Sequence, residues 1–268
     1  RLSLLFPDTY NGQPRRLLDA VLREAGHYPV IGAGSSENGT QGATYQMSGD
    51  LVLSNSVSGL HLWGGFNVHV DVTQGCQPIT KPMTITRSLQ NVIFEIDRRP
   101  AFQVFTGLLK GPLLEDLRRA LAYVFVGLPP SRERGEIEQG RYLVRNIVGL
   151  DPARGTVAIA ETPREGDTIV FALRDGPRAR EDLIQMLDRQ AARLDCKRPA
   201  FGFYFNCCAR GASLYGFPGI DTAYIQRRFG DFPLVGMFGG YELAPLGAAN
   251  HLFAYTGVLA LVTEQDAS

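Results

Sequence analysis

FGFYFNCCARGASLYGFPGIDTAYIQRRFGDFPLVG, residues 201–236, is the stretch whose pattern decides the fold. The apolar, aromatic-rich run at 201–206 predicts a buried strand, and residues 220–229 have the apolar spacing of a helix. Pro233-Leu234-Val235-Gly236 then begins a second apolar strand, expected to reach Phe238. A strand, a helix and a strand in this order predict a layered structure of sheets and helices.

The same pattern occurs near the start of the chain. A strand at 2–6 is followed there by a helix over 14–25 and by Pro29-Val30-Ile31-Gly32. Small residues and then an acid, Glu37 or Glu242, follow each occurrence, and later a strand that contains a glycine. A unit that recurs in this way indicates an internal duplication. The alternative is chance, because strand–helix–strand units are common.

Strand and helix patterns interleave through the rest of the chain. Further strands are expected at 50–63, 67–72, 83–87, 91–96, 142–150, 156–160, 168–173 and 251–262, further helices at 101–109, 113–125 and 178–194, and an exposed polar loop at 129–138. We therefore expect an α/β, mixed α+β fold of two related layered lobes, with mixed sheets flanked by helices. The first lobe is expected to cover residues 1–97 and the second residues 98–268.

Composition excludes several classes of partner. Lys plus Arg and Asp plus Glu both number 27, so the chain lacks the positive surplus that nucleic-acid binding uses. The longest apolar stretch near the end, 253–262, is too short and interrupted to cross a bilayer, and no secretory leader is visible. The four cysteines follow no zinc or disulfide pattern, which is typical of reduced thiols. These features predict a cytoplasmic protein with no nucleic-acid or membrane partner, no metal and no cofactor.

A set of motifs, taken in order, resembles the paired N- and C-terminal domains of the FIST family. They are PVIGAGS at 29–35, GCQPI at 75–79, MTITR at 83–87, NVI at 91–93, EID at 95–97, PA at 100–101, NCCARG at 206–211, GMFGGYELAP at 236–245 and HLFAYTG at 251–257. Tyr241 and Ala244 depart from the pattern, since many members have glycine there. The resemblance implies a FIST N-terminal domain over 1–97, truncated at its start, and a FIST C-terminal domain over 98–268.

The family likeness also implies a function. The resemblance implies an intracellular sensory module of the kind found in bacterial signalling proteins and, in eukaryotes, beside F-box domains. Small ligands such as amino acids have been proposed for them. The expected partners are therefore a small-molecule ligand and a signalling protein.

Candidate site residues lie in loops that follow the apolar strands of the second lobe. Arg210, with Gly211 beside it, could present a planar fork of donors to a carboxylate. Glu242, after Gly240, could accept from an ammonium group. One pocket containing Arg210, Glu242 and the glycines would suit a zwitterion, and a structural ion pair between Arg210 and Glu242 is the alternative. The candidate ligand-binding set is Cys208, Arg210, Gly211, Gly236, Gly240, Glu242 and His251, with Gly32, Gly34 and Ser35 as candidates in the first lobe.

Three functions remain open from the sequence. The first is a ligand-binding sensor, with no catalysis. The second is a protein-interaction platform that uses the same loops. The third is a cysteine-dependent enzyme in which Cys208 is activated by His251 and Glu242, which would require three separate loops to converge. A cysteine that ends an apolar strand is more often a packed small side chain.

Overall fold

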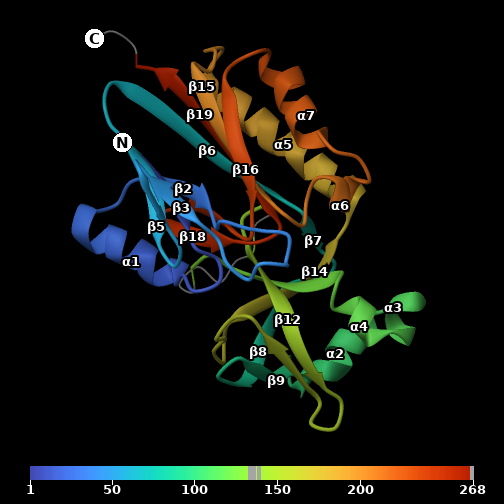
Figure 1. Cartoon of the computed structure of the whole chain (residues 1–268). Coiled ribbons are helices and arrows are strands. Elements are labelled where there is room, and N and C mark those ends of the chain that lie inside the picture. Colours follow the sequence, from blue (N-terminus) through green and yellow to red (C-terminus); the bar gives the residue numbers. More distant parts are fainter. Residues whose placement is uncertain (132–136, 138–139, 266–268) are drawn as a thin grey trace. The chain divides into compact units, whose positions relative to one another are not determined.

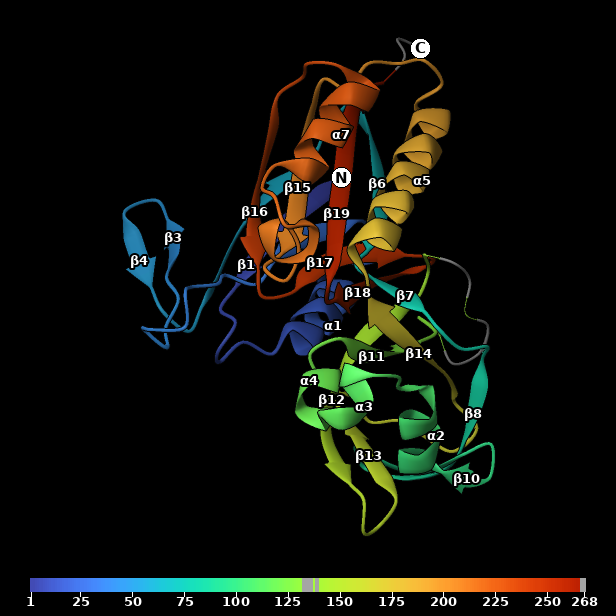
Figure 2. The same ribbon diagram turned by 90° about the vertical axis from the view of Figure 1, so that its right-hand side faces the viewer.

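A computed structural model describes residues 1–131, 137 and 140–265 of the chain. The described chain forms two compact units (Figures 1 and 2). Unit 1 combines residues 1–75 with residues 176–268, and unit 2 is continuous over residues 76–175. The sequence-based boundary near residue 97 therefore falls inside unit 2. Within the described residues, no helix is both long enough and apolar enough to span a bilayer.

The first strand–helix–strand segment forms part of one sheet of unit 1. It consists of β1 (Leu2–Pro7), α1 (Pro14–Ala25) and β2 (Val30–Ala33), and β2 lies parallel to β1. The later strand β5 (Val57–Leu62) pairs antiparallel with the other side of β1. The local order in this first repeat is therefore β2-β1-β5.

The second segment has the same topology. It consists of β15 (Phe201–Cys207), α7 (Ile220–Phe229) and β16 (Leu234–Gly239), and β16 lies parallel to β15. The later strand β19 (Thr256–Glu264) pairs antiparallel with the other side of β15, so this second repeat has the order β16-β15-β19. The shared order and directions support the duplication. Both repeats belong to unit 1, whereas the sequence had suggested one in each lobe.

Further strands extend both sheets of unit 1. The complete orders are β18-β17-β2-β1-β5 and β16-β15-β19-β6, and the short hairpin β3–β4 is separate. These strands are β3 (Gln46–Ser48), β4 (Leu51–Leu53), β6 (Phe66–Gln74), β17 (Glu242–Leu246) and β18 (Ala249–Phe253). The single strands expected at 50–63 and 251–262 are thus two strands each, because the chain bends out of the extended conformation at residues 54–56 and 254–255.

Helices cover the sheet of the second repeat (Figure 2). Helix α5 (Gly176–Leu194) packs on β6, where Asp182 accepts hydrogen bonds from the backbone N–H of Gln74 (2.6 Å) and the hydroxyl of Thr73 (2.8 Å). The remaining helix of the unit is the short α6 (Ala212–Tyr215). Leu183, Met186 and Leu187 of α5 share a buried cluster with Ile225 of α7 and Leu259 of β19. The helix expected over 178–194 therefore packs through these side chains, whereas Ile184, which also belongs to its apolar pattern, is 40% exposed.

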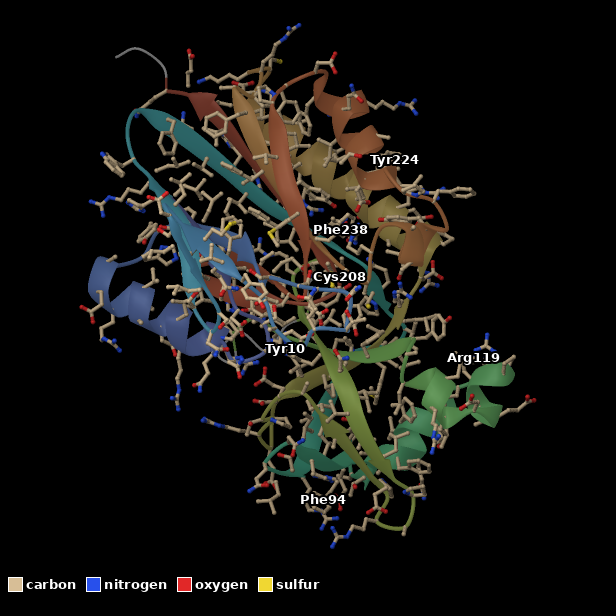
Figure 3. All side chains as sticks on the ribbon, viewed as in Figure 1. Tyr10, Phe94, Arg119, Cys208, Tyr224 and Phe238 are labelled. Carbon is tan, nitrogen blue, oxygen red and sulfur yellow. The ribbon has the colours of Figure 1, made fainter. Side chains whose placement is uncertain are left out.

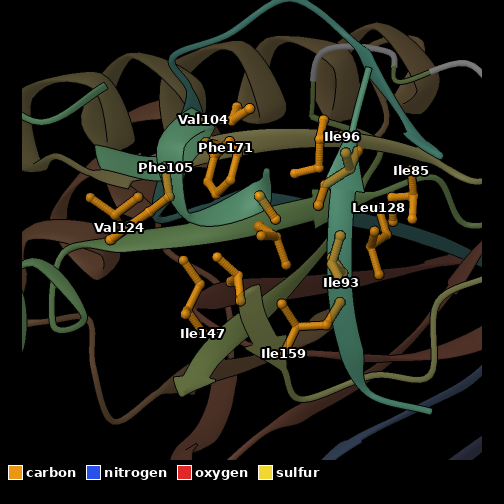
Figure 4. Packing of buried hydrophobic residues seen from close by; sticks show 14 of the residues in the cluster. Ile85, Ile93, Ile96, Val104, Phe105, Val124, Leu128, Ile147, Ile159 and Phe171 are labelled. Atoms are coloured by element: carbon orange, nitrogen blue, oxygen red, sulfur yellow. The ribbon is translucent and has the colours of Figure 1, made fainter. Parts of the chain in front are cut away.

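Unit 2 is built around its own core. Its strands are β7 (Cys76–Pro78), β8 (Met83–Leu89), β9 (Val92–Ile96), β10 (Arg99–Pro100), β11 (Val124–Leu128), β12 (Leu143–Asp151), β13 (Thr156–Ile159) and β14 (Thr168–Arg174). Six of them close into a ring, because β8 pairs with both β9 and β14 at the two ends of the run β9-β13-β12-β11-β14. Helix α2 (Ala101–Leu108) adds Val104 and Phe105 to the apolar interior (Figure 4).

The prediction of a helix over 113–125 is wrong in its second half. The structure has two single turns, α3 (Pro112–Glu115) and α4 (Leu117–Ala120), and Asp116 caps the second by accepting from the backbone N–H of Arg119. Val124 and Phe125 instead begin β11, a strand buried along its whole length between β12 and β14. A short apolar run fits a buried strand as well as a helix, and tertiary pairing decided between them. Most of the loop expected at 129–138 lies outside the described residues.

Candidate ligand-binding site

A cavity of about 240 Å³ lies between the parallel strands β15 and β16 and the start of α7, within unit 1. Ligands of open α/β sheets commonly bind near the carboxyl ends of parallel strands, where the chain leaves the sheet. The lining consists of Tyr204, Asn206, Gly211, Gly219, Ile220, Asp221, Thr222, Leu234, Val235, Gly236, Met237 and Phe238. The second repeat thus supplies every residue of this cavity.

Two glycines allow the backbone to come close around the cavity. A Cβ at Gly236 would lie 1.8 Å from the backbone oxygen of Tyr204, so no side chain fits there without separating β16 from β15. Gly211 has φ of +60°, and a Cβ there would be 3.1 Å from the ring of Phe238. Larger residues at either position would therefore change the walls of the cavity.

Asp221, in the first turn of α7, is the centre of a buried polar cluster beside the cavity. Its Oδ2 accepts hydrogen bonds from the hydroxyl of Tyr204 (2.9 Å) and from Nδ2 of Asn206 (2.8 Å). Its Oδ1 forms an ion pair with Nη2 of Arg210 at 3.3 Å. Burial is the main reason that the pKa of Tyr204 is raised well above its usual value, so this hydroxyl remains a donor.

Arg210 lies behind the cavity rather than in it. Its side chain has 0% exposure, and Nη2 also donates to the hydroxyl of Tyr215 at 2.7 Å. Burial by itself would lower the pKa of Arg210, but the neighbouring Tyr204 and Asp221 outweigh this effect and raise it. Arg210 therefore stays charged and forms a buried ion pair with Asp221. Within this cluster the two charges balance.

One polar atom of the lining has no partner in the described part of the chain. Oδ1 of Asn206 accepts no hydrogen bond, although the residue is only 4% exposed. A buried acceptor left unsatisfied costs about 1–3 kcal/mol, so such groups usually have a partner in the working molecule. Asn206 lines the cavity, but this oxygen is itself enclosed, so a donor in the cavity would reach it only after the amide turned toward the cavity.

The amino end of α7 adds donors to the same cavity. Gly219 is the N-cap residue, with φ of +75°, and no side chain caps the first turn. The first backbone N–H groups of a helix have no partner within the helix, and they carry the positive end of the helix dipole. Ile220, Asp221 and Thr222 bring this first turn to the cavity wall. A negative group would be stabilised at this position.

Comparison with protein families agrees with the sequence motifs. The FIST N domain matches residues 1–99, and the FIST C domain matches residues 101–245, so together the two cover most of the chain. The chain belongs to the FIST family. FIST domains are recognised as sensory modules of signal transduction. The cavity lies in the part of unit 1 that follows residue 200, and all of its lining residues fall within the FIST C match.

Curated relatives of similar sequence come from mycobacteria. An uncharacterized protein of Mycobacterium tuberculosis is 29% identical over 263 residues, and one of Mycobacterium bovis is 31% identical over 264 residues. Each match covers 98% of this chain and 68% of the relative. This FIST chain therefore corresponds to about two thirds of their length.

Among the candidate residues of the FIST C match, only Gly211 and Gly236 line the cavity. Arg210 reaches it indirectly, through Asp221. Its ion-pair partner is Asp221, and not Glu242 as one interpretation of the sequence had it. The ligand-binding role of the full predicted set stays a prediction, because most of the set does not line this cavity.

The loops after β2 and β16 meet outside the cavity. Gly34 and Gly240 face each other, since the backbone N–H of Gly240 donates to the oxygen of Gly34 at 3.0 Å. Ser35 donates its backbone N–H to the oxygen of Pro7, and a Cβ at Gly32 in β2 would lie 1.9 Å from the oxygen of Leu5. Cys208 is exposed, with Sγ 3.3 Å from the hydroxyl of Ser36 (Figure 3). These residues form a contact between the two repeats.

Glu242 and His251 belong to the other sheet of unit 1. Glu242 begins β17, has 0% exposure and accepts a 2.7 Å hydrogen bond from the hydroxyl of Thr256. Burial, only partly offset by Thr256, raises the pKa of Glu242 to about 8. His251 lies in β18, where it pairs with Ala244 of β17. Neither residue lines the cavity.

Asn206, Asp221 and Thr222 were missed as site residues from the sequence. Asn206 is a polar residue at the end of an otherwise apolar strand, and Asp221 follows the glycine that starts a helix. Both signals are visible in the sequence, but each is common. Only the folded chain shows that the two side chains bond to each other beside a cavity.

Proposed function

We propose that this FIST chain is a sensory module that binds a small ligand in the cavity between β15, β16 and α7. The ligand class that fits best is an amino acid, with small carboxylates as the nearest alternative. The observation that carries the proposal is the meeting of an uncapped helix start and the unpartnered Oδ1 of Asn206 at one cavity.

The two ends of a zwitterion match the two polar parts of the wall. A carboxylate would accept from the first backbone N–H groups of α7. An ammonium group would donate to Oδ1 of Asn206, near the carboxylate of Asp221. Because Arg210 already balances Asp221, a ligand with no net charge avoids leaving an uncompensated charge in a buried site.

The size and apolar wall of the cavity limit the rest of the ligand. Sites for drug-sized molecules usually have about 300–1,000 Å³, and this cavity has about 240 Å³. Leu234, Met237 and Phe238 supply its apolar wall. A ligand of amino-acid size with an apolar side chain therefore fits better than a nucleotide or a peptide.

Thermal-shift and calorimetric titrations with the standard amino acids, small carboxylates and small amines test this proposal. A true ligand at about one hundred times its Kd adds about 2.7 kcal/mol of stability. For a chain of this size the Tm should then rise by roughly 5–10 °C. We expect amino acids to give the largest rise and simple amines the smallest.

A matched pair of variants locates the binding. Thr222 lines the cavity, and Ala223 is the next residue of α7 but does not line it; both are exposed. Thr222→Trp should fill the cavity and abolish the ligand-induced shift, while Ala223→Trp should keep it. A panel in which no compound stabilises the chain, or a shift that survives Thr222→Trp, would contradict the proposal.

A protein-interaction platform is the second candidate, and one observation favours it. Val235 and Phe238, at the cavity wall, are 62% and 51% exposed, and Phe217 nearby in the sequence is 68% exposed. Large apolar side chains at this exposure often mark a contact with another protein. The platform would be favoured over the sensor if a protein partner bound the chain, if Phe238→Ser abolished that binding, and if no amino acid in the panel raised the Tm.

We further propose that the module binds without catalysing a reaction. The thiol of Cys208 has the hydroxyl of Ser36 beside it, while His251 lies in β18 and Glu242 is buried against Thr256. A thiol nucleophile needs a base within hydrogen-bond reach. Slow labelling of Cys208 by an activity-type thiol probe is expected, and rapid selective labelling would count against this part of the proposal.

A further inference from the structure

Strand β5 forms an open edge of its sheet. It is the last strand of the order β18-β17-β2-β1-β5 and pairs with β1 on one side. Val57 and Leu60 of β5 are 44% and 52% exposed, and Trp63, directly after it, is 74% exposed. Large apolar side chains along an unpaired edge are unusual, because such edges invite pairing with another strand.

The internal repeat shows how the equivalent strand is completed. In the second repeat β19 takes the place of β5, and it has β15 on one side and β6 on the other. β6 runs antiparallel to β19 in register from Thr256↔Gln74 to Glu264↔Phe66. Residues 258–262 of β19 are at most 1% exposed, and Leu259 and Leu261 pack in the cluster that includes α5 and α7. Among the described residues, β5 of the first repeat has no such outer neighbour.

The open edge also lacks the usual protection against pairing. The sequence of β5, VSGLHL, has no lysine, acid or proline, which are the residues that normally block an edge. The hairpin β3–β4 contacts β5, and its Met47, Leu51 and Val52 are between 60% and 70% exposed. Figure 2 shows this hairpin projecting from the rest of the ribbon.

We propose that β5 is a dimerisation edge, at which β5 of a second molecule of this chain pairs antiparallel. The position that β6 fills beside β19 requires an antiparallel strand. A two-fold axis brings two identical strands together in this antiparallel direction, so β5 is complementary to itself. The formal net charge of the chain is zero, so two molecules approach without net repulsion.

This pairing would complete the sheet of the first repeat as β6 completes that of the second. Each molecule would supply backbone hydrogen bonds to the edge of the other and cover Val57, Leu60 and Trp63. The proposal is independent of the ligand cavity, which lies in the second repeat, so either can fail without the other.

The proposal is tested on the whole 268-residue chain by size exclusion coupled to light scattering and by sedimentation velocity over a series of micromolar concentrations. The chain should have the mass of a dimer. Leu60→Lys and Leu60→Glu should each be folded monomers with a cooperative melting transition that no longer depends on protein concentration, since like charges would approach each other across the axis. Mixing the two variants should restore a dimer that contains one of each.

Val235→Lys is the matched control, because Val235 is 62% exposed on β16, the open edge of the other sheet, and this variant should remain a dimer. Trp63→Lys gives a second monomer variant if a charge at residue 60 disturbs folding. A wild-type chain that is monomeric throughout, dimers that resist both changes, or a Lys/Glu mixture that stays monomeric would each overturn the proposal.

Discussion

Arg210 and Glu242 are both buried in unit 1, but only Arg210 has an oppositely charged partner. Arg210 has a carboxylate partner in Asp221 and donates to Tyr215. Glu242 accepts hydrogen bonds at Oε2 from the backbone N–H and the hydroxyl of Thr256, and the buried thiol of Cys207 also lies beside its carboxyl group, which makes no ion pair among the described residues. A buried carboxylate without a cation is costly, which is why its neutral form is favoured.

Glu242→Gln should therefore change how stability depends on pH. In the unfolded chain Glu242 ionises near its ordinary pKa of 4.5, whereas in the folded chain its pKa is about 8. The native state binds the extra proton between these values, so stability falls as pH rises from about 4.5 to about 8. Thermal melts should show that Glu242→Gln removes part of this fall and raises the Tm at pH 8 by a few degrees.

The exposed Glu24, beside Arg23, provides the control for this experiment. Glu24→Gln should leave the pH profile as it is in the wild type, because its carboxylate is solvated in both states. If Glu242→Gln lowers the Tm equally at pH 5 and pH 8, the side chain acts through its shape or hydrogen bond and not through its charge.

At the scale of elements, each repeat contains the same close contact between its two parallel strands. A Cβ at Gly32 of β2 would meet the oxygen of Leu5 in β1, and one at Gly236 of β16 would meet the oxygen of Tyr204 in β15. The two glycines occupy the same place in two copies of one topology. This shared constraint is a backbone feature that the duplication preserved.

Alanine at either glycine should separate the paired strands. We expect Gly32→Ala and Gly236→Ala each to lower the free energy of unfolding by about 2–4 kcal/mol in urea titrations. Gly107→Ala, in helix α2 with nothing within 4 Å of the new Cβ, should be neutral or stabilising. A Gly236→Ala variant as stable as the wild type would mean that β16 can move away from β15 at little cost.

The elements differ in how far the sequence could determine them. Helix α7 and strands β15 and β16 were predictable because their apolar residues recur at one clear period. Strand β11 was not, since a short apolar run fits a helix equally well and only its pairing with β12 and β14 decides. The site was harder still, because the bond from Asn206 to Asp221 joins side chains whose meeting depends on how the loop between them folds.

For the whole molecule, the order of the sequence differs from the order in space. Both repeats build unit 1, and unit 2 is inserted between β6 and α5 as a continuous stretch. The FIST N and FIST C matches meet near residue 100, inside that insertion. Family boundaries therefore follow the chain, while the compact units follow the packing, and the sequence alone gives no sign that its two ends share a core.

Unit 2 should consequently fold by itself. Its core contains residues such as Ile93, Phe105 and Phe171, all within 76–175, and its six central strands form a closed ring (Figure 4). A fragment of residues 76–175 should give a single cooperative melt, with roughly 5–15 kcal/mol of stability if it behaves as an ordinary domain.

Two variants of this fragment test its core. Phe105→Ala should lower that stability by about 3–5 kcal/mol, whereas Leu89→Ala, at a residue 67% exposed, should change it little. A fragment with no cooperative transition would mean that unit 2 requires unit 1 to fold.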